Sequence, residues 1–413
     1  MCVDNFIIFK YSAHLKLKGE RKDMNIPLLD LRAQYLSIQE EIDQKILEVV
    51  SSQRFILGPE VEEFEKEMAA YSGAEFAVGV SSGSDALIIS LMALGVGEGD
   101  AVVTTPFTFF ATVGAIARLK AKPVFCDIEK KSFNIDPAKL EEVLESQLRK
   151  EGISAIKAVI PVHLYGQCVD MTPIMDCAKK YDLFVIEDSA QAVGAEYPTP
   201  EGIKKACTLG NLGILSFFPS KNLGGFGDGG MVLTDEEELA QKLKLLRGHG
   251  SRNKYFYDIL GGNFRLDALQ ASILRVKLKY LETWHQKRRE KALYYNKIFQ
   301  ESGLVEEGKI QIPEPLYKDS GVKNYHIYHQ YVLRAKERDK LLEFLKGKGV
   351  GTAVYYPLPL HLQKCFSYLG YKEGDFPVAE KATHEVLAIP VYPEITSEQQ
   401  DYVVTSISTF YKS

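Results

Sequence analysis

Short apolar runs alternate with amphipathic segments along most of the chain. Apolar positions recur at helical spacing from Tyr35 to Val50 and from Val61 to Tyr71, and a nearly all-apolar helix is indicated at Ala86 to Leu94. Strand-like runs occupy residues 100–106, 122–128, 155–166 and 183–190. Because strands that alternate with helices of ten or more residues form βα units, the pattern predicts a mixed, mostly parallel sheet in a three-layer α/β/α domain.

The hydrophobic pattern changes near Phe264. A long amphipathic helix is predicted for residues 265–299, and a smaller α+β portion follows it. We therefore predict a large domain over residues 24–275 and a small C-terminal domain over residues 276–413. Residues 1–23 are charged and aperiodic. They are either a flexible extension or a segment ahead of a natural start at Met24, and we favour the second.

The composition is that of a globular, enzyme-sized protein. The chain has 413 residues, 46% hydrophobic and 25% charged, with a net charge of -5. Because no long basic run is present, nucleic-acid binding has little electrostatic support. The six cysteines form no CxxC pair and indicate reduced thiols, and no apolar stretch is long enough to cross a bilayer. We expect a cytoplasmic protein that binds neither nucleic acid nor membrane.

Three predicted strand ends carry unusual residues, and the first is the sequence VGVSSGSDALIISLMAL. A strand that ends at Val80 continues into a turn of small residues, with Gly83 and Ser84 at the start of a buried helix. Such a turn offers backbone N–H groups and the positive end of the helix dipole to a phosphate. The alternative is an ordinary serine N-cap.

The second strand end is LFVIEDSAQAVGAEY. Four apolar residues place Glu187 and Asp188 at the carboxyl end of the strand, where ligands of α/β sheets gather, and Gln191 follows. An acidic residue there is a metal or cofactor ligand, or else a helix cap. The sequence favours neither interpretation by itself.

The third strand end is LSFFPSKNLGGFGDGGMVL, with Lys221 between an apolar run and a glycine-rich loop. The loop contains GxGxxG, but the β-rich run MVLTDEE follows where a dinucleotide site needs a helix. A P-loop is also excluded, because no Lys-Ser/Thr pair follows the glycines. The remaining interpretations of Lys221 are a surface charge, a phosphate contact or a nucleophile.

Together, the three strand ends match one cofactor. Pyridoxal 5′-phosphate (PLP) needs a phosphate site, a carboxylate for its ring nitrogen and a lysine amine for its aldehyde. The predicted helix start at Gly83, Asp188 and Lys221 offer these groups in turn. PFTFFAT, at residues 106–112, adds an aromatic side chain for the face of the ring.

These motifs, together with several others, resemble those of the DegT/StrS family of PLP-dependent nucleotide-sugar aminotransferases. The similar motifs, which span about residues 25–393, are IPLLDLRAQY, SSGSDAL, PFTFFAT, PVHLYGQ, EDSAQAVGA, SFFPSKNLGGFGDGG, GGNFRLDALQASIL and YYPLPLHLQ. SFFPSKN together with EDSAQA is the most distinctive pair. The resemblance implies a fold-type-I PLP-dependent transferase, whose cofactor cycles between PLP and pyridoxamine 5′-phosphate (PMP).

The resemblance also implies roles for individual residues. Lys221 would form the Schiff base with PLP and move the proton between the substrate Cα and C4′ of the cofactor. Asp188 would pair with the ring nitrogen, and Phe109 would stack on the ring. The other implied cofactor contacts are Gln191 on the hydroxyl side of the ring, Gly83, Ser84 and Ser216 at the phosphate, and Asn263, which would reach the phosphate from the second subunit of a homodimer.

The resemblance implies the reaction as well. L-Glutamate would give its amino group to a keto sugar on a nucleotide diphosphate, and two of the motifs look most like 3-aminotransferases of dTDP-linked 3-keto-6-deoxyhexoses. A UDP-linked 3-keto-N-acetylhexosamine, or amination at C4, is the alternative. Because sugar contacts come from loops, the candidates are spread along the chain. They are His163, Tyr356, His361 and, across the interface, Tyr257.

Four other interpretations concern the same residues or the whole chain. A metal pair at His326 and His329 is not predicted, because their odd spacing in a strand points them to opposite faces. His163 is also compatible with a buried histidine that is bonded to a backbone carbonyl. Dehydratase relatives carry histidine in place of the lysine, so Lys221 argues against their chemistry. A non-catalytic, PLP-binding regulatory protein is the remaining rival from another class.

Overall fold

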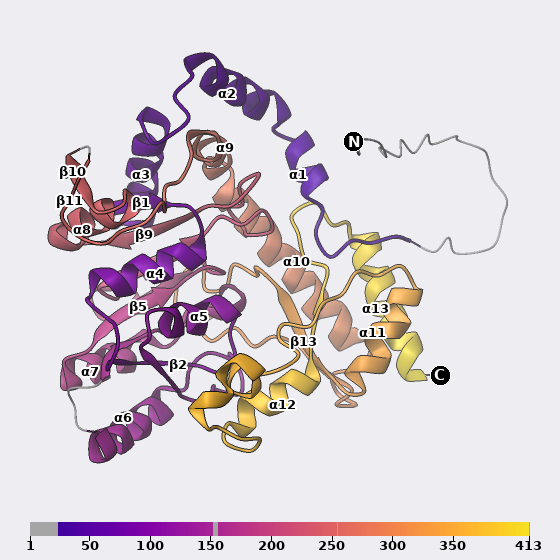
Figure 1. The fold of residues 1–413 in the computed structure, drawn as a ribbon. Helices are drawn as coiled ribbons and strands as arrows, with labels where there is room; N and C mark the ends of the chain where they lie inside the picture. Colours follow the sequence, from indigo (N-terminus) through magenta and orange to yellow (C-terminus); the bar gives the residue numbers. More distant parts are fainter. Residues whose placement is uncertain (1–23, 152–155, 254, 413) are drawn as a thin grey trace, which may run out of the picture.

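The computed structural model describes residues 24–151, 156–253 and 255–412, so the predicted extension at residues 1–23 lies outside the described residues. A seven-stranded sheet consists of β1 (Phe76–Val80), β2 (Ala101–Thr104), β3 (Lys122–Phe125), β4 (Ile156–Val159), β5 (Phe184–Asp188), β8 (Leu212–Ser216) and β9 (Gly230–Thr234). Their order across the sheet is β1-β9-β8-β5-β4-β2-β3 (Figure 1). β9 is antiparallel to β1 and β8, and the other neighbouring strands are parallel. The sheet is therefore mixed and mostly parallel, as the apolar pattern predicts.

Both faces of this sheet are buried, because alternate strand residues enter different hydrophobic cores. Val78 and Val232 pack into one core with helices on the first face, whereas Ala77 and Met231 pack into another core on the second face. The helices of the first core are α4 (Gly83–Ala93), α5 (Phe110–Arg118) and α8 (Glu237–Arg247). The opposite face carries α2 (Gln39–Ser52), α3 (Pro59–Ser72), α6 (Pro137–Glu151), α7 (Met171–Tyr181) and α9 (Ala268–Leu278).

The C-terminal region has its own small antiparallel sheet and core. Its strands are β12 (Ile310–Gln311), β13 (Tyr331–Ala335) and β14 (Val386–Ile389), and its core is formed with α10 (Leu281–Glu301), α11 (Arg338–Gly347) and α13 (Ser397–Lys412). Ile26 also packs in this core and pairs with Val350. The first described residues therefore contact the C-terminal region, and the predicted domain boundaries stay a prediction.

The remaining elements are short or peripheral. They are α1 (Leu31–Leu36), α12 (Pro377–Glu385), the 3₁₀ turns Leu164–Gly166, Leu360–Leu362 and Lys364–Leu369, and two hairpins, β6 (Glu196–Thr199) with β7 (Gly202–Lys205) and β10 (Ser251–Asn253) with β11 (Phe256–Tyr257). Among the described residues, no helix is both long enough and apolar enough to span a bilayer.

The strand order brings three carboxyl ends to one edge of the large sheet. β1, β8 and β5 run in the same direction, and β9 lies between β1 and β8. Gly230, the first residue of β9, pairs with both Val80 and Ser216. The turn after β1, the end of β5 and the Lys221 turn after β8 therefore meet at this edge.

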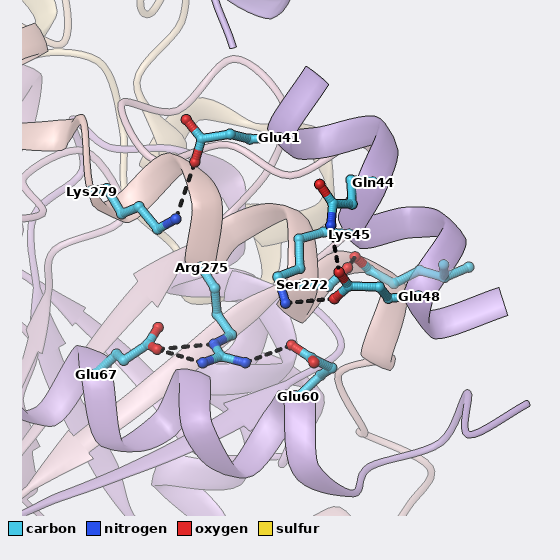
Figure 2. A network of polar contacts seen from close by, with 10 residues as sticks. Glu41, Gln44, Lys45, Glu48, Glu60, Glu67, Ser272, Arg275 and Lys279 are labelled. Atoms are coloured by element: carbon cyan, nitrogen blue, oxygen red, sulfur yellow. Dashed lines mark hydrogen bonds and ion pairs between the residues drawn. The ribbon is translucent and has the colours of Figure 1, made fainter. Parts of the chain in front are cut away.

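A network of charged side chains fixes α9 against α2 and α3 (Figure 2). The guanidinium of Arg275 donates to Glu67 through Nε (3.0 Å) and Nη2 (2.7 Å), and to Glu60 through Nη1 (2.7 Å). Lys279 adds an ion pair with Glu41 of α2 at 3.1 Å. Arg275 lies in the last turn of α9 and Lys279 is its C-cap residue, so these contacts hold the C-terminal end of the helix against α2 and α3.

Candidate active site

A cavity of about 510 Å³ lies at the edge where the strand ends meet. It is lined from the large sheet by the α4 turn, the end of β5 and the turns after β8, and from the C-terminal region by residues that flank β13. Seven of the predicted cofactor contacts line it, namely Gly83, Ser84, Phe109, Asp188, Gln191, Ser216 and Lys221. Tyr356 is the predicted sugar contact that also reaches it.

The N-terminus of α4 forms one end of the cavity. Ser82 is the N-cap, because its Oγ accepts from the amide of Asp85 at 3.1 Å. The amides of Gly83 and Ser84 have no hydrogen-bond partner among the described residues, so both are available to an anion. The same turn can therefore hold the serine N-cap and an anion-binding site at once.

Gly83 is in close contact with the end of β8. A Cβ built at Gly83 would lie 2.7 Å from Cβ of Ser216, which is closer than real side chains approach. Ser216 also lines the cavity. Glycine at this position therefore lets a helix N-terminus and a strand end share one wall of the site.

The two adjacent carboxylates at the end of β5 have different surroundings. Glu187 is wholly buried and accepts from the amides of Leu209 (2.6 Å), Gly210 (2.8 Å) and Cys207 (3.0 Å). It also bonds Nε2 of His163 at 2.9 Å. These contacts give Glu187 a structural role away from the cavity.

Asp188 is the carboxylate that faces the cavity. Its Oδ2 accepts from the hydroxyl of Thr112 at 2.8 Å, and its Oδ1 accepts from the amide of Ala190 at 3.2 Å. Burial raises the pKa of Asp188, whereas these two hydrogen bonds and the nearby charge of Lys221 lower it. Asp188 is thus held in a fixed orientation at the edge of the sheet.

Lys221 lies in the turn after β8, whose backbone is closed by a bond from its amide to the carbonyl of Phe218 at 2.8 Å. Burial lowers the pKa of the Lys221 amine to about 8, and the negative charge of Asp188 acts in the opposite direction. Its Nζ has no hydrogen-bond partner among the described residues. At pH 7, roughly a tenth of such an amine is uncharged and nucleophilic, far more than for a lysine with an ordinary pKa.

Gln191, Tyr356 and Phe109 complete the side of the cavity near Asp188. The side chain of Gln191 accepts from the amide of Tyr165 at 2.8 Å and donates to the hydroxyl of Tyr356 at 3.2 Å. Phe109 is 58% exposed, and its ring centroid lies 6.4 Å from that of Tyr356. An aromatic ring that is open to a cavity can stack on a planar ligand.

The other four predicted site residues lie outside this cavity. His163 is buried and bonded to Glu187 and to the amide of Val169. His361 is buried between Phe125 and Phe376 and bonds Glu380 at 3.0 Å. Asn263 is exposed and pairs with Gly248, and the exposed Tyr257 lies in β11. The cavity therefore contains all the cofactor candidates except Asn263, and only one of the sugar candidates, Tyr356.

The structure adds residues for which the sequence suggested no role. Thr112 lies behind the cavity and orients Asp188, and Asp228, His329, Gln330 and Tyr355 line the cavity wall. His329 and His326, whose spacing argued against a metal pair, line different cavities. Their positions depend on how the C-terminal region packs onto the sheet, so no local pattern could identify them.

The chain matches the DegT/DnrJ/EryC1/StrS aminotransferase family over residues 36–408. A pleiotropic regulatory protein from Geobacillus stearothermophilus is 49% identical, over 94% of this chain and 99% of the relative. A UDP-N-acetyl-3-dehydro-alpha-D-glucosamine 3-aminotransferase from Acidithiobacillus ferrooxidans is 39% identical, over 92% of this chain and 97% of the relative. A dTDP-3-amino-3,6-dideoxy-alpha-D-galactopyranose transaminase from Aneurinibacillus thermoaerophilus is also 39% identical, over 93% and 99% respectively.

A solved structure provides an independent comparison. NtdA from Bacillus subtilis, determined with bound cofactor PMP, is 32% identical, and the two structures superpose with a TM-score of 0.83 over 96% of this chain and 87% of that chain. The predicted fold class, a fold-type-I aminotransferase architecture, is therefore confirmed.

Proposed function

The chain belongs to the DegT/DnrJ/EryC1/StrS aminotransferase family, and on this premise we propose that it moves an amino group from L-glutamate to C3 of a nucleotide-linked keto sugar. It is a PLP-dependent aminotransferase, and its cofactor cycles between PLP and PMP. One observation carries the proposal: Lys221, Asp188 and the N-terminus of α4 share one cavity.

The residues of the cavity fit PLP group by group. The unpartnered amides of Gly83 and Ser84, with the hydroxyl of Ser216 beside them, would hold the phosphate. Asp188 would bind the protonated ring nitrogen, and Phe109 would cover the face of the ring. A Cβ at Gly83 would fill part of this cradle. The donor set thus suits an aromatic phosphate monoester with a basic ring nitrogen.

Each residue would make a separate contribution to catalysis. Bound PLP supplies an aldehyde that takes up the amino group and a ring that accepts electrons from the neighbouring carbon. Asp188 would hold a proton on the ring nitrogen, and Thr112 keeps that carboxylate oriented. Lys221 would move the proton between Cα of the amino donor and C4′ of the cofactor, in opposite directions in the two half-reactions.

The keto sugar is proposed from two relatives of equal identity. The Aneurinibacillus thermoaerophilus relative is named for a dTDP-linked 3-amino-3,6-dideoxyhexose, and the Acidithiobacillus ferrooxidans relative for a UDP-linked 3-dehydro-glucosamine. Both names place the nitrogen at C3. We propose a dTDP-3-keto-6-deoxyhexose as substrate, and a UDP-linked 3-keto-N-acetylhexosamine as the second candidate.

A homodimer would complete the site. Asn263 does not line the cavity of its own chain, although the family pattern gives it a cofactor contact. Beside it, Phe256, Tyr257 and Leu260 are 72%, 64% and 91% exposed, which is unusual for apolar side chains on a monomer surface. A second copy that covers this surface would bring Asn263 and Tyr257 to the neighbouring cavity.

The proposed activity is tested by absorption spectroscopy of the purified, PLP-loaded protein. Addition of L-glutamate alone should convert the yellow form to the PMP form, and 2-oxoglutarate should appear in equal amount. Addition of dTDP- or UDP-linked 3-keto sugars should then restore the yellow band with the correct substrate only. A protein that binds PLP but produces no 2-oxoglutarate would contradict the aminotransferase activity with glutamate.

The regulatory alternative is addressed by the same experiment. The Geobacillus stearothermophilus relative is named as a pleiotropic regulatory protein. A purely regulatory PLP-binding protein would not move an amino group, so it would stay yellow when glutamate is added. Formation of PMP by the wild-type protein, and its loss in Lys221→Ala, would assign this chain to the enzymes.

A further inference from the structure

His329 enters the cavity from the C-terminal region and is not used by the mechanism above. It lies in the segment before β13, it is only 9% exposed, and it lines the cavity together with Lys221. Its ring is close enough to Lys221 for the lysine charge to lower the pKa of the imidazole, in addition to the larger effect of burial. The ring is therefore neutral at physiological pH.

A hydrogen bond from the residue next to Lys221 determines which ring nitrogen of His329 faces the cavity. Nδ1 of His329 bonds Oδ1 of Asn222 at 2.8 Å, and Nδ2 of Asn222 donates to the carbonyl of Ile327 at 3.4 Å. Because the amide oxygen can only accept, Nδ1 of His329 carries the proton. Nε2 is then an unprotonated acceptor, and it has no hydrogen-bond partner among the described residues.

The backbone around His329 is held on both sides. Arg288, which is 3% exposed, donates through Nη1 to the carbonyls of Tyr328 (3.1 Å), His329 (3.4 Å) and Val391 (2.8 Å). The amide of Ile327 donates to the carbonyl of Gly166 at 2.9 Å. A ring with a fixed tautomer on a fixed backbone is a preorganised acceptor, not a mobile side chain.

Lys221 needs such an acceptor whenever its amine is charged and not bonded to the cofactor. A buried ammonium without a hydrogen-bond partner is unfavourable. The carboxylate of Asp188 accepts from Thr112 and Ala190 and is assigned to the ring nitrogen of the cofactor, and the hydroxyl of Tyr356 accepts from Gln191. Two neutral acceptors of the cavity wall remain among the described residues, namely Oε1 of Gln330, which is buried without a hydrogen-bond partner, and Nε2 of His329, which Asn222 does not engage. Of these two groups, the ring of His329 is the one on which the charge of Lys221 acts.

We propose that Nε2 of His329 accepts a hydrogen bond from the Lys221 ammonium. This bond would hold the amine in place while it is free, so that it can bond the cofactor again. This role rests on the proposed function, in which Lys221 is released when an amino donor takes its place. His329 is a positioning residue, because it acts through Lys221 and not on the substrate.

A hydrogen bond from Lys221 to His329 would also change how the free lysine titrates, whether or not the protein catalyses a reaction. An acceptor that bonds the charged amine stabilises the ammonium and raises the pKa of Lys221, so removal of the acceptor lowers that pKa. The other titratable groups that line the cavity are Asp188 at the end of β5, Asp228 in the glycine turn, and Tyr355 and Tyr356 before α12. They are unchanged in the variants below, so a shift would report on His329.

Two substitutions at His329 distinguish the role of Nε2 from that of Nδ1. His329→Asn places an amide where Nδ1 lies and keeps a donor for Asn222, but it has no atom at the position of Nε2. His329→Gln extends one bond further and presents an amide oxygen to the cavity. His326→Asn is the matched control, because His326 lies three residues earlier in the same segment and lines a different cavity.

The measurement is the pH dependence of PLP capture by the apoprotein. Only the uncharged amine of Lys221 forms the C–N bond to the aldehyde carbon, with loss of water, so the rate of appearance of the yellow band reports the fraction of uncharged amine. For His329→Asn, we expect the pH at half-maximal rate to fall by about one unit relative to wild type. His329→Gln should shift by less than half of that, and His326→Asn should not shift.

Several outcomes would overturn the proposal. An unchanged midpoint in His329→Asn, or equal shifts in His329→Asn and His329→Gln, would exclude an acceptor role for Nε2. A shift in Gln330→Met but not in His329→Asn would assign the acceptor to the neighbouring side chain. Melting temperatures within about 2 °C of wild type establish that folding is preserved, and a variant outside that range is replaced by His329→Ser.

This test is independent of the proposed function. If wild type captures PLP but does not form PMP with glutamate, the aminotransferase activity with glutamate fails while the role of His329 is still decided by the capture midpoints. If PMP forms normally and the midpoints do not move, the proposed function stands and the role of His329 is excluded.

Discussion

The strand-end cluster, formed by Gly83, Asp188, Ser216 and Lys221, differs in kind from the exposed hairpin of β10 and β11 together with the loop that follows it to residue 263. In the cluster, each residue lines one cavity at the edge of a buried sheet, and Asp188 has its hydrogen bonds within the chain. On the hairpin, large apolar side chains face outward without a core of their own. The comparison indicates that one chain contains the chemical groups for the cofactor, whereas the exposed apolar surface is the part that the proposed second subunit would cover.

We expect the largest effect from a substitution that removes the nucleophile of the strand-end cluster. Lys221→Ala should lower kcat by about 10³-fold or more, because both the covalent contact and the proton transfer are lost. Stopped-flow absorbance with L-glutamate checks this, and Lys120→Ala, at an exposed lysine that pairs with Glu98, is the control. Turnover of Lys221→Ala near the wild-type value would remove Lys221 from the mechanism.

The second prediction concerns the two adjacent carboxylates at the end of β5, Glu187 and Asp188, of which only Asp188 faces the cavity. Asp188→Asn should lower the rate of α-proton exchange of glutamate about 10²-fold without a large change in stability, because the amide cannot keep the ring nitrogen protonated. Loss of solvent deuterium exchange, followed by NMR, measures this effect. Normal exchange in Asp188→Asn would contradict its assigned role.

Glu187→Gln is the matched comparison for Asp188→Asn. Glu187 accepts three backbone amides and bonds His163, so its substitution leaves buried donors unsatisfied. We expect a loss of roughly 1–3 kcal/mol in the free energy of unfolding and a smaller change in proton exchange. Denaturant unfolding of the two variants distinguishes a structural carboxylate from a catalytic one.

The third prediction concerns the exposed hairpin. Phe256→Asp should weaken self-association and also cofactor affinity, because a separated subunit loses the contact proposed for Asn263. Sedimentation velocity and PLP titration measure the two effects on the same sample. Ile203→Asp is the control, since Ile203 is 57% exposed on β7 and away from the hairpin. A Phe256→Asp protein that remains dimeric would exclude this surface as the interface.

We expect the smallest effect, a change in PLP affinity, from a methyl group added at the proposed phosphate site. Gly83→Ala should weaken PLP binding about tenfold, because the added Cβ would crowd Ser216 and force a shift of the helix start. Gly97→Ala, where nothing lies within 4 Å of the added Cβ, should change affinity and stability little. Equilibrium titration of both apoproteins tests whether the close contact of the two elements matters for binding.

The cofactor side of the site could be predicted because its residues follow strand ends. The apolar runs before Val80, Glu187 and Ser216 predict strands, and the carboxyl ends of such strands meet at one edge of a sheet. The substrate side could not be predicted in the same way. His163 and His361 carry suitable chemistry in sequence, but both side chains are buried, bond Glu187 and Glu380, and do not line the cavity.

By itself, the sequence determined the alternation of strands and helices, the chemistry placed at three strand ends, and the family. Those properties depend on local periodicity and on residue type, which a single chain displays directly. Only the tertiary structure decided which of two adjacent carboxylates faces the cavity and that His329 stands beside Lys221. Such choices depend on strand register and on the packing of the C-terminal region against the sheet, because contacts between residues about a hundred positions apart leave no local pattern in the chain.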